Sequence, residues 1–316
     1  MTEPQSIAVE PPSGRTVLVT GGAGFIGSHL VDALVEDNAV RILDNFSSGT
    51  PDRVHPDATV FEGDIRDDAT LSRAMDGVDL VFHEAALVSV QASVEEPKRS
   101  HSVNLEATLS LLECARREDA RVVLASSAAI YGQPEYTPID EGHPTEPSSP
   151  YGLEKLTIDR YARLYHELYG LETVALRYFN VYGPRQAGGD YSGVISIFLE
   201  QARNGEPITV NGDGTQTRDF VHISDVVQAN LLAAQTESVG AAFNVGTGET
   251  VTIRELAETI RSVVGSDSEI VHRDPRPGDI EQSQAELSAI RSALGYEPTV
   301  TLADGLQTLV EATSNN

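Results

Sequence analysis

A buried strand runs directly into a glycine-rich turn and then into a helix near the start of this sequence. The apolar run Thr16–Thr20 predicts the strand, and Phe25–Glu36 predicts the helix. Gly21, Gly24 and Gly27 follow the strand at intervals of three residues. Such glycines allow a tight turn and a close approach of the backbone to a pyrophosphate, which binds at the helix N-terminus. The turn therefore predicts a dinucleotide-binding fold; the alternative is a tight turn without a ligand.

Short apolar runs alternate with helical patterns through the first 180 residues. Runs of Val, Leu and Ile separated by helices are typical of an α/β protein whose parallel sheet is covered on both faces. Right-handed crossovers between the strands then give a doubly wound Rossmann sheet. The further strands that we expect are Val40–Leu43, Thr59–Phe61, Asp79–His83, Arg121–Ala125 and Thr173–Leu176, with helices near 67–76, 101–118 and 150–169.

The rhythm changes after Tyr178, where loops rich in Gly, Pro and Asp appear. Helical patterns lie near 193–204, 252–264 and 285–294, whereas 223–246 returns to a helix and a buried strand, Phe243–Val245. We therefore expect two domains. An NAD-binding Rossmann domain would span 15–178 plus 223–246, and a second, smaller substrate-binding domain would span 179–222 plus 247–316.

The charge balance excludes one class of partner. The chain has 48 acidic and 22 basic residues, a net charge of −26, and only two lysines, Lys98 and Lys155. A surface this acidic repels polyanions, so we expect no nucleic-acid partner. Loss of lysine together with gain of acid favours a halophilic protein, adapted to molar salt, over an ordinary acidic one.

The chain shows no pattern for export, membrane insertion or metal binding. Residues 1–14 are polar and proline-containing, which predicts a flexible tail rather than a signal peptide. No run reaches the roughly 18 apolar residues of a membrane helix. Cys114 is the only cysteine, and His83, His222 and His272 lack the spacing of metal ligands. We expect a cytoplasmic protein without a metal or a membrane partner.

Two acidic residues follow the second and third strands. Asp44 ends the second strand, where a carboxylate can accept hydrogen bonds from a ribose and would repel a 2′-phosphate. This favours NAD over NADP; the alternative is a solvated acid at a strand end. Asp64, after the third strand, is placed to receive the adenine amino group, and ordinary turn chemistry is its alternative.

A tyrosine and a lysine share one face of the helix expected at 150–169. Tyr151 and Lys155 are four residues apart, and Ser126 and Ser127 end the fifth strand, at the ligand edge of a doubly wound sheet. To act as a base near neutral pH, the tyrosine pKa must fall by about 3 units from about 10. A nearby ammonium and a cationic nicotinamide both favour the phenolate. The alternative is a chance pair on a solvated helix.

These motifs together resemble the extended short-chain dehydrogenase/reductase superfamily, in its NAD-dependent epimerase/dehydratase branch. The resemblance covers about Arg15 to Leu309. It rests on TGGAGFIG (20–27), LDN (43–45), GDI (63–65), HEAA (83–86), SSAAIYG (126–132), YGLEK (151–155), RYFNVYGPR (177–185), TRDFVHISD (217–225) and RPGD (276–279). It implies that Tyr151 is the base, that Lys155 clamps the cofactor and modifies the tyrosine pKa, and that Ser127 shares the proton.

The resemblance also implies the binding residues. Matches to the family's NAD site are Gly21, Gly24, Phe25, Ile26, Gly27, Asp44, Asn45, Asp64, Ile65, Ala85, Ala86, Asn104, Tyr151, Lys155 and Phe179. Arg218 and Arg276 match arginines that bind the diphosphate of a UDP-sugar, and forked guanidinium donors suit phosphate oxygens. Asn180 matches a residue that touches the same group. Surface ion pairs are the alternative for the arginines, and loop capping is the alternative for Asn180.

The two residues after Ser127 distinguish the reactions of this branch. Dehydratases carry an Asp-Glu pair there and decarboxylases keep a Glu, whereas this chain has Ala128 and Ala129, which cannot move a proton. The 4-keto sugar can then only take its hydride back, which predicts epimerisation of a UDP-hexose at C4, between UDP-glucose and UDP-galactose. The alternatives are a 4,6-dehydratase, a UDP-glucuronate 4-epimerase, and a non-catalytic dinucleotide sensor.

Substrate breadth and assembly are two further expectations from the resemblance. The position seven residues after Arg276, Ser283, lines the pocket beside the C2 substituent in the family. A small residue there admits acetamido sugars, which predicts turnover of UDP-GlcNAc and UDP-GalNAc too; a solvated loop residue is the alternative. The helices near 101–118 and 150–169 pair across a two-fold axis in the family, which predicts a homodimer.

Overall fold

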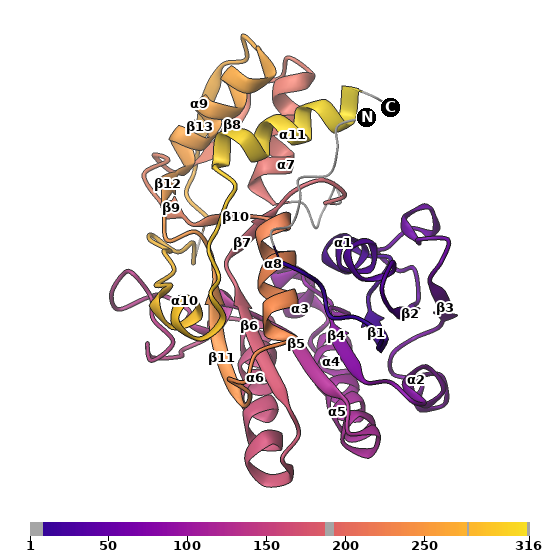
Figure 1. Ribbon diagram of the computed structural model, residues 1–316. Helices are drawn as coiled ribbons and strands as arrows, with labels where there is room; N and C mark the ends of the chain where they lie inside the picture. The colour runs from indigo at the N-terminus through magenta and orange to yellow at the C-terminus, as the bar shows by residue number, and fades with distance from the viewer. Residues whose placement is uncertain (1–8, 187–192, 277, 315–316) are drawn as a thin grey trace.

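The computed structural model describes residues 9–186, 193–276 and 278–314, and it contains the parallel sheet that the sequence predicts (Figure 1). Seven strands pair in parallel in the order β11-β6-β5-β4-β1-β2-β3. They are β1 (Thr16–Thr20), β2 (Ala39–Asp44), β3 (Thr59–Glu62), β4 (Leu80–His83), β5 (Arg121–Ser127), β6 (Thr173–Tyr178) and β11 (Ala241–Val245). The doubly wound α/β class is confirmed.

Helices cover both faces of the sheet because successive strand residues point to opposite sides. Val17 and Val19 of β1 join one apolar core, and Leu18 between them joins the other. The first core is covered by α1 (Phe25–Leu34), α8 (Ile223–Ala233) and α10 (Ser288–Leu294). The second is covered by α2 (Asp68–Met75), α5 (Ala107–Glu118) and α6 (Pro150–Tyr169).

The segment between β4 and α5 differs from the single helix expected at 101–118. It forms α3 (Val90–Glu95), α4 (Pro97–His101) and a π-helical stretch, η2 (Ser102–Glu106), which continues into α5. Such a stretch widens the helix and is frequent at functional sites. Short 3₁₀ turns occur elsewhere, at η1 (Pro51–Arg53) and η3 (Ala128–Ile130). The apolar pattern alone did not reveal the π-helical stretch, because the pattern continues without interruption from η2 into α5.

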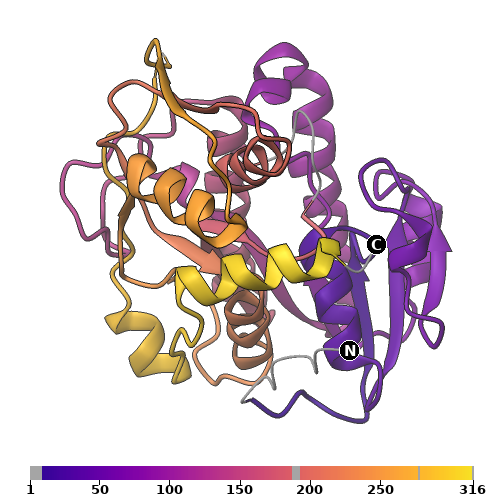
Figure 2. The same cartoon turned by 90° about the horizontal axis from the view of Figure 1, so that it is seen from above.

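A separate hydrophobic core, which we call the second-domain core, lies beyond the sheet. It is formed by α7 (Val194–Arg203), α9 (Ile253–Val264) and α11 (Leu302–Ser314), packed on the parallel strands β8 (Ile208–Asn211) and β13 (Ile270–Arg273). Figure 1 shows these helices gathered at one end of the molecule, and Figure 2 looks down on that end from above. Two short pairs connect this core to the sheet: β7 (Asn180–Tyr182) with β10 (Phe220–His222), and β9 (Thr217–Arg218) with β12 (Val251–Thr252).

Two boundaries differ from the expected ones. Residues 1–8 lie outside the described residues, but 9–14 are held: the carbonyls of Glu10 and Pro12 accept hydrogen bonds from Gln235 and Asn38. The expected tail is therefore attached to the sheet domain from residue 9 onward by these hydrogen bonds and by Val9, which packs against the core. Residues 285–296, which we assigned to the second domain, instead pack into the sheet core through Ile290 and Tyr296. They do so because α10 lies against β11 and α8.

The strand order reverses between β1 and β4, since the chain winds from β1 to β2 on one side and to β4 on the other. Ligands of doubly wound sheets bind outside the carboxyl ends of the strands at this switch point. None of the helices in the described ranges is long and apolar enough to cross a membrane.

Candidate active site

The glycine turn after β1 has room for glycine alone. Gly21 has φ +69°, and a Cβ there would lie 2.9 Å from the backbone nitrogen of Ala85. A Cβ at Gly27 would lie 2.2 Å from the Gly21 carbonyl oxygen. Gly24 is the N-cap of helix α1 and provides no side-chain cap, so no capping side chain occupies the N–H groups of the first turn. Phe25 and Ile26 form the first turn of this helix. The turn thus has the shape and donors that fit a pyrophosphate.

Asp44, at the end of β2, braces the same turn. Its carboxylate accepts hydrogen bonds from the backbone nitrogen of Ala23 at 3.0 Å and from that of Phe46 at 2.8 Å, and its side chain is buried. Asn45 follows it and caps its own turn by accepting from Ser47. The predicted ribose-binding carboxylate therefore lies directly beside the glycine turn, with each oxygen fixed by one backbone donor.

Asp64 is engaged by a neighbour. Arg66 donates to both of its oxygens, at 2.8 Å and 2.6 Å. These hydrogen bonds lower the pKa of Asp64 to about 2. The adjacent Ile65 is buried. The turn chemistry that we held as the alternative is present, and binding of an adenine amino group by Asp64 stays a prediction.

Asn104 clamps the loop that carries Ala85 and Ala86. Its side-chain oxygen accepts from the backbone nitrogen of Leu87 at 2.8 Å, and its amide nitrogen donates to the Leu87 carbonyl at 3.1 Å and to Glu154 at 2.8 Å. The π-helical stretch η2 places Asn104 for these contacts. Asn104, predicted to bind NAD, thus ties the cofactor loop to the helix that carries Tyr151 and Lys155.

The structure brings Tyr151, Lys155 and Ser127 together. Helix α6 begins after Ser149, whose hydroxyl accepts from the backbone nitrogen of Gly152. One turn further on, the buried Lys155 donates from Nζ to the carbonyl of Ala125 on β5 at 2.6 Å. That ammonium lies 5.9 Å from the centre of the Tyr151 ring, and Ser127 is hydrogen-bonded to the tyrosine hydroxyl.

Burial works against the chemistry that this cluster needs. It raises the pKa of Tyr151 to about 12, opposite to the fall that a base requires, and the hydrogen bond from Ser127 lowers the pKa in part. Burial also lowers the pKa of Lys155, while the charges of Glu84 and Glu154 raise it. The phenolate therefore depends on cationic groups around it. Sequence reasoning missed both glutamates; an acid directly after the apolar run of β4 was the available signal.

The two positions after Ser127 carry no acidic residue. The 3₁₀ turn η3 begins at Ala128, and the Ser127 hydroxyl accepts a hydrogen bond from the backbone nitrogen of Ala129. His83, expected to be structural, lies between the hydroxyls of Thr20 and Thr108, and burial lowers its pKa to about 3. Within the described residues, no three His, Cys, Asp or Glu side chains are arranged to hold a metal.

The predicted diphosphate ligands lie between the sheet and the second-domain core: Asn180 in β7, Arg218 in β9, and Arg276 in the loop after β13. Arg218 is mostly buried and ion-paired with Asp279, and it also donates to the Ile280 carbonyl at 2.6 Å. Asn180 donates to the carbonyl of Asp219 at 3.1 Å, as its loop-capping alternative requires. Arg276 is exposed. The structure thus shows the alternatives for Arg218 and Asn180, and diphosphate binding stays a prediction. Phe179, from the NAD prediction, is buried beside them.

Ser283 is 7% exposed, which rules out its alternative as a solvated loop residue. Its segment is anchored by Asp219, which accepts from the backbone nitrogen of Ala285 at 3.1 Å. Ala285 also bridges to Ile139 on the loop that follows η3. The segment therefore runs back to the sheet after Arg276, and the role of Ser283 beside the C2 substituent stays a prediction.

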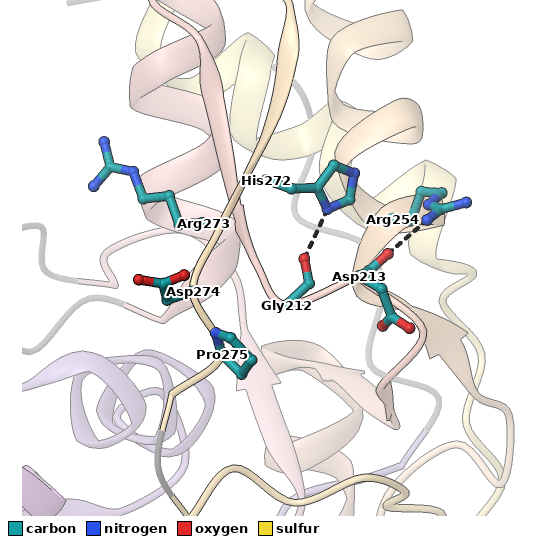
Figure 3. A pocket seen from close by; sticks show the side chains of 7 residues that line it. All are labelled: Gly212, Asp213, Arg254, His272, Arg273, Asp274 and Pro275. Atoms are coloured by element: carbon teal, nitrogen blue, oxygen red, sulfur yellow. Dashed lines mark hydrogen bonds between the residues drawn. The ribbon is translucent and has the colours of Figure 1, made fainter.

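A hollow of about 480 Å³ opens at the ends of β8 and β13. Figure 3 shows Arg273 and Arg254 pointing away from each other, each outward from the hollow, while His272 donates from Nδ1 to the Gly212 carbonyl at 2.8 Å. Because its charged groups do not converge, this hollow is not a candidate site. Tyr151, Lys155 and Ser127 remain the chemical centre.

The model of the NAD dependent epimerase/dehydratase family matches residues 17–246. The chain belongs to this family. UDP-glucose 4-epimerase of Mycolicibacterium smegmatis is 39% identical over 303 residues, which cover 93% of this chain and 97% of the relative. UDP-glucuronic acid decarboxylase 6 of Arabidopsis thaliana is 34% identical over 311 residues, which cover 95% of this chain and 89% of the relative. The family thus includes relatives that catalyse different reactions.

Solved structures of the family share the whole fold. UDP-N-acetylglucosamine 4-epimerase from Methanobrevibacter ruminantium M1, in complex with UDP-N-acetylmuramic acid, has a TM-score of 0.93 at 38% identity, covering 96% of this chain and 99% of that one. UDP-glucose 4-epimerase of Thermus thermophilus, in complex with NAD, has a TM-score of 0.87 at 39% identity, covering 94% and 98%. NAD is the cofactor of this family, and the glycine turn and Asp44 fit it.

Proposed function

We propose that this chain is a UDP-hexose 4-epimerase that works with bound NAD. The observation that carries the proposal is the convergence of Tyr151, Lys155 and Ser127 at the carboxyl edge of the sheet. In addition, Ser127 is followed by Ala128 and Ala129, where dehydratases and decarboxylases have acidic residues. UDP-sugar 4-epimerases are also prominent among the similar proteins. The proposed product is therefore the C4 epimer, because the site has the residues for proton transfer at C4 and no acidic residue after Ser127 for elimination.

The roles follow from the geometry. The glycine turn and Asp44 would hold NAD, which would supply the hydride acceptor and donor for C4 of the sugar. Tyr151 takes the proton of the C4 hydroxyl as the carbon is oxidised and gives it back as the carbon is reduced. Ser127, hydrogen-bonded to the phenol, holds the reacting oxygen. Lys155, fixed on Ala125, supplies the positive charge that favours the phenolate.

The anionic substrate needs cations on a protein of net charge −26. Arg218 is the proposed internal ligand of the diphosphate, and Arg276 is the exposed one. To bind a phosphate, Arg218 must exchange Asp279 for it, and the guanidinium can make this exchange because both partners are oxygen anions. Ser283 is proposed to leave room for an acetamido group at C2.

Other reactions of the family need a separate test, because a relative of this chain is named a UDP-glucuronic acid decarboxylase. Decarboxylation or dehydration would need a side chain to move a further proton. Ala128 and Ala129 cannot do so. A uronic acid could still be epimerised, because that reaction uses the same three residues.

We also propose a homodimer in the cytoplasm. Helix α6 exposes a row of large apolar side chains, Leu153, Leu164 and Leu168, of which Leu168 is 59% exposed. Apolar rows of this kind mark contact surfaces. The lone cysteine, Cys114, leaves no internal disulfide, which suits a reducing compartment. Light scattering on the purified protein would reveal the mass of one chain if the dimer proposal is wrong.

The decisive experiment is product analysis. The purified protein is incubated separately with UDP-glucose, UDP-GlcNAc and UDP-glucuronate, and the products are identified by proton NMR. Inversion at C4 without loss of water or carbon dioxide supports the proposal. A 4-keto-6-deoxy sugar or a pentose as the main product would replace it with elimination or decarboxylation.

A further inference from the structure

Glu84 places a carboxylate at the switch point of the sheet. It directly follows β4, and its backbone nitrogen donates to the carbonyl of Thr20, the last residue of β1, at 3.2 Å. Its carbonyl carbon would be 3.1 Å from a Cβ placed on Gly21. Glu84 therefore lies between the glycine turn and the centre of the sheet. It has no role so far, either in binding the pyrophosphate or in the proton transfer.

The carboxylate is held in place from the far side. The hydroxyl of Tyr178, at the end of β6, donates to Oε1 of Glu84 at 2.9 Å. The same hydroxyl accepts from the side-chain nitrogen of Asn230 on the buried face of α8 at 2.8 Å. This hydrogen bond holds the partly exposed carboxyl group of Glu84 at this edge of the sheet.

Strand register brings that charge beside Lys155. His83 pairs with Leu124 across β4 and β5, so the next positions along the two strands are Glu84 and Ala125. The carbonyl of Ala125 is the acceptor of the Lys155 ammonium. Neighbouring parallel strands lie about 4.8 Å apart. The backbone of Glu84 is therefore adjacent to that of Ala125, the residue whose carbonyl holds the Lys155 ammonium.

A buried lysine without a counter-charge loses its proton. Burial lowers the pKa of Lys155, and the charge of Glu84 is the largest influence that raises it, ahead of Glu154. In return, Lys155 lowers the pKa of Glu84, which burial raises. The other titratable groups that face this pair are His83 on β4, Tyr178 on β6 and Tyr151 on α6.

We propose that Glu84 is a positioning residue of the active site, whose carboxylate, held by Tyr178, is the counter-charge that keeps the buried Lys155 protonated. Glu154 adds to this charge but is engaged elsewhere: its Oε2 accepts from Ser100 at 2.6 Å and from Asn104. Glu84 acts on the reaction through its charge, which raises the pKa of Lys155 and also that of Tyr151.

The lysine content of the chain makes a direct measurement possible. Lys155 and the exposed Lys98 are the only two lysines, so selective ¹⁵N,¹³C-lysine labelling gives two side-chain signals. Lys98→Arg assigns them. The titration of Lys155 is followed by NMR in the NAD-bound protein, with Lys98 as the internal reference. Glu84→Gln is expected to lower the titration midpoint of Lys155 by about one pH unit. Glu84→Asp retains the negative charge, so the midpoint should stay close to that of the unsubstituted protein.

The control is Glu141→Gln. Glu141 is another partly buried carboxyl group, which accepts from the backbone nitrogen of Asn244 at 2.8 Å but is absent from the charges acting on Lys155. Its substitution should leave the Lys155 midpoint unchanged. If Glu84→Gln does not fold, Tyr178→Phe tests the same point, because loss of its hydrogen bond raises the pKa of Glu84 and weakens the counter-charge. An unmoved Lys155 midpoint, or an equal shift in Glu141→Gln, overturns the proposal.

A kinetic consequence rests on the proposed epimerase function, whereas the NMR titration does not. The charge of Glu84 raises the pKa of Tyr151 as well as that of Lys155. Active enzyme needs a deprotonated Tyr151 and a protonated Lys155, so Glu84→Gln should move both limbs of the kcat profile to lower pH. A loss of kcat that is equal at every pH would show a merely structural role and would also overturn the proposal.

Discussion

Asp159 and Arg177 form a buried ion pair between the middle of α6 and β6. The guanidinium donates from Nε to Asp159 at 2.8 Å, and the two side chains are 0% and 3% exposed. Arg177 also donates to the hydroxyl of Tyr131 at 2.9 Å, beyond η3. The helix that carries Tyr151 and Lys155 is thereby fixed to the strand that follows it and to the loop after Ser127.

Asp159→Asn should destabilise the protein strongly. Removing one partner leaves the Arg177 charge buried without its counter-ion, which costs about 3–5 kcal/mol. Glu113→Gln is the matched control, because its pair with Arg116 is about two-fifths exposed and contributes about 1 kcal/mol or less. Urea unfolding of the three proteins gives the difference; equal midpoints would mean that the buried pair carries no net stability.

Tyr151→Phe should abolish epimerisation and leave the fold and NAD content intact. Loss of the group that moves the proton lowers kcat by about 10²–10⁴. Tyr161→Phe, further along α6, removes a hydroxyl outside the cluster and should keep near-normal kcat. Coupled assay of UDP-galactose conversion measures both. A Tyr151→Phe enzyme with more than about a tenth of the normal kcat would contradict the role of the tyrosine.

The cofactor should be NAD and not NADP, because Asp44 repels a 2′-phosphate at the end of β2. We expect NAD to remain bound through purification and apo-protein to discriminate strongly against NADP. Asp44→Asn should reduce the ratio of the two Kd values at least tenfold, equivalent to about 1.4 kcal/mol. Asp64→Asn, which instead breaks a pair with Arg66, should leave that ratio alone. Calorimetric titration of each apo-protein provides the comparison.

Salt should stabilise the fold. With 48 acidic and 22 basic residues, repulsion between acids is least screened at low ionic strength. We expect loss of structure below a few tenths molar KCl and, above that concentration, a Tm that rises steadily up to molar KCl. Sucrose, which does not screen charge, is the control. A circular dichroism melt that is the same at low and high KCl would remove the halophilic interpretation.

Ser283→Tyr should narrow the substrate range. The buried serine would gain a phenol ring where an acetamido group must fit, and overpacking of this kind costs about 1–3 kcal/mol. We expect kcat/KM for UDP-GalNAc to fall at least tenfold while that for UDP-galactose changes little. The wild-type protein must first convert UDP-GalNAc; if it does not, another residue closes the pocket.

The sheet domain could be predicted in detail because its signals are local. Thr16–Thr20 and the helix at 150–169 match β1 and α6 to the residue, since each lies between strong start and stop signals. The π-helical stretch around Asn104 and helix α11 were missed. Asn104 is fixed by contacts with Leu87 and Glu154, and α11 is fixed by packing in the second-domain core. Neither feature therefore depends on the local sequence pattern.

The chemistry of the site was less predictable than its position. The spacing of Tyr151 and Lys155 indicated their common face, but a spacing carries no information about burial, which raises the tyrosine pKa. The partner of an acid is equally hidden. Asp64 is engaged by Arg66, two residues away, and Arg218 by Asp279, 61 residues away. Such pairs are decided by loop conformation and not by residue type.

The packing of 285–296 against the sheet has a consequence for how the chain folds during synthesis. Ile290 and Tyr296 complete a core whose first members are Val17 and Val19, and the Tyr296 hydroxyl donates to the Gly246 carbonyl at 2.9 Å. Part of the apolar surface of the nascent sheet stays uncovered until the chain has been synthesised past Tyr296. A fragment ending at residue 246 would therefore aggregate, although it spans every strand of the sheet.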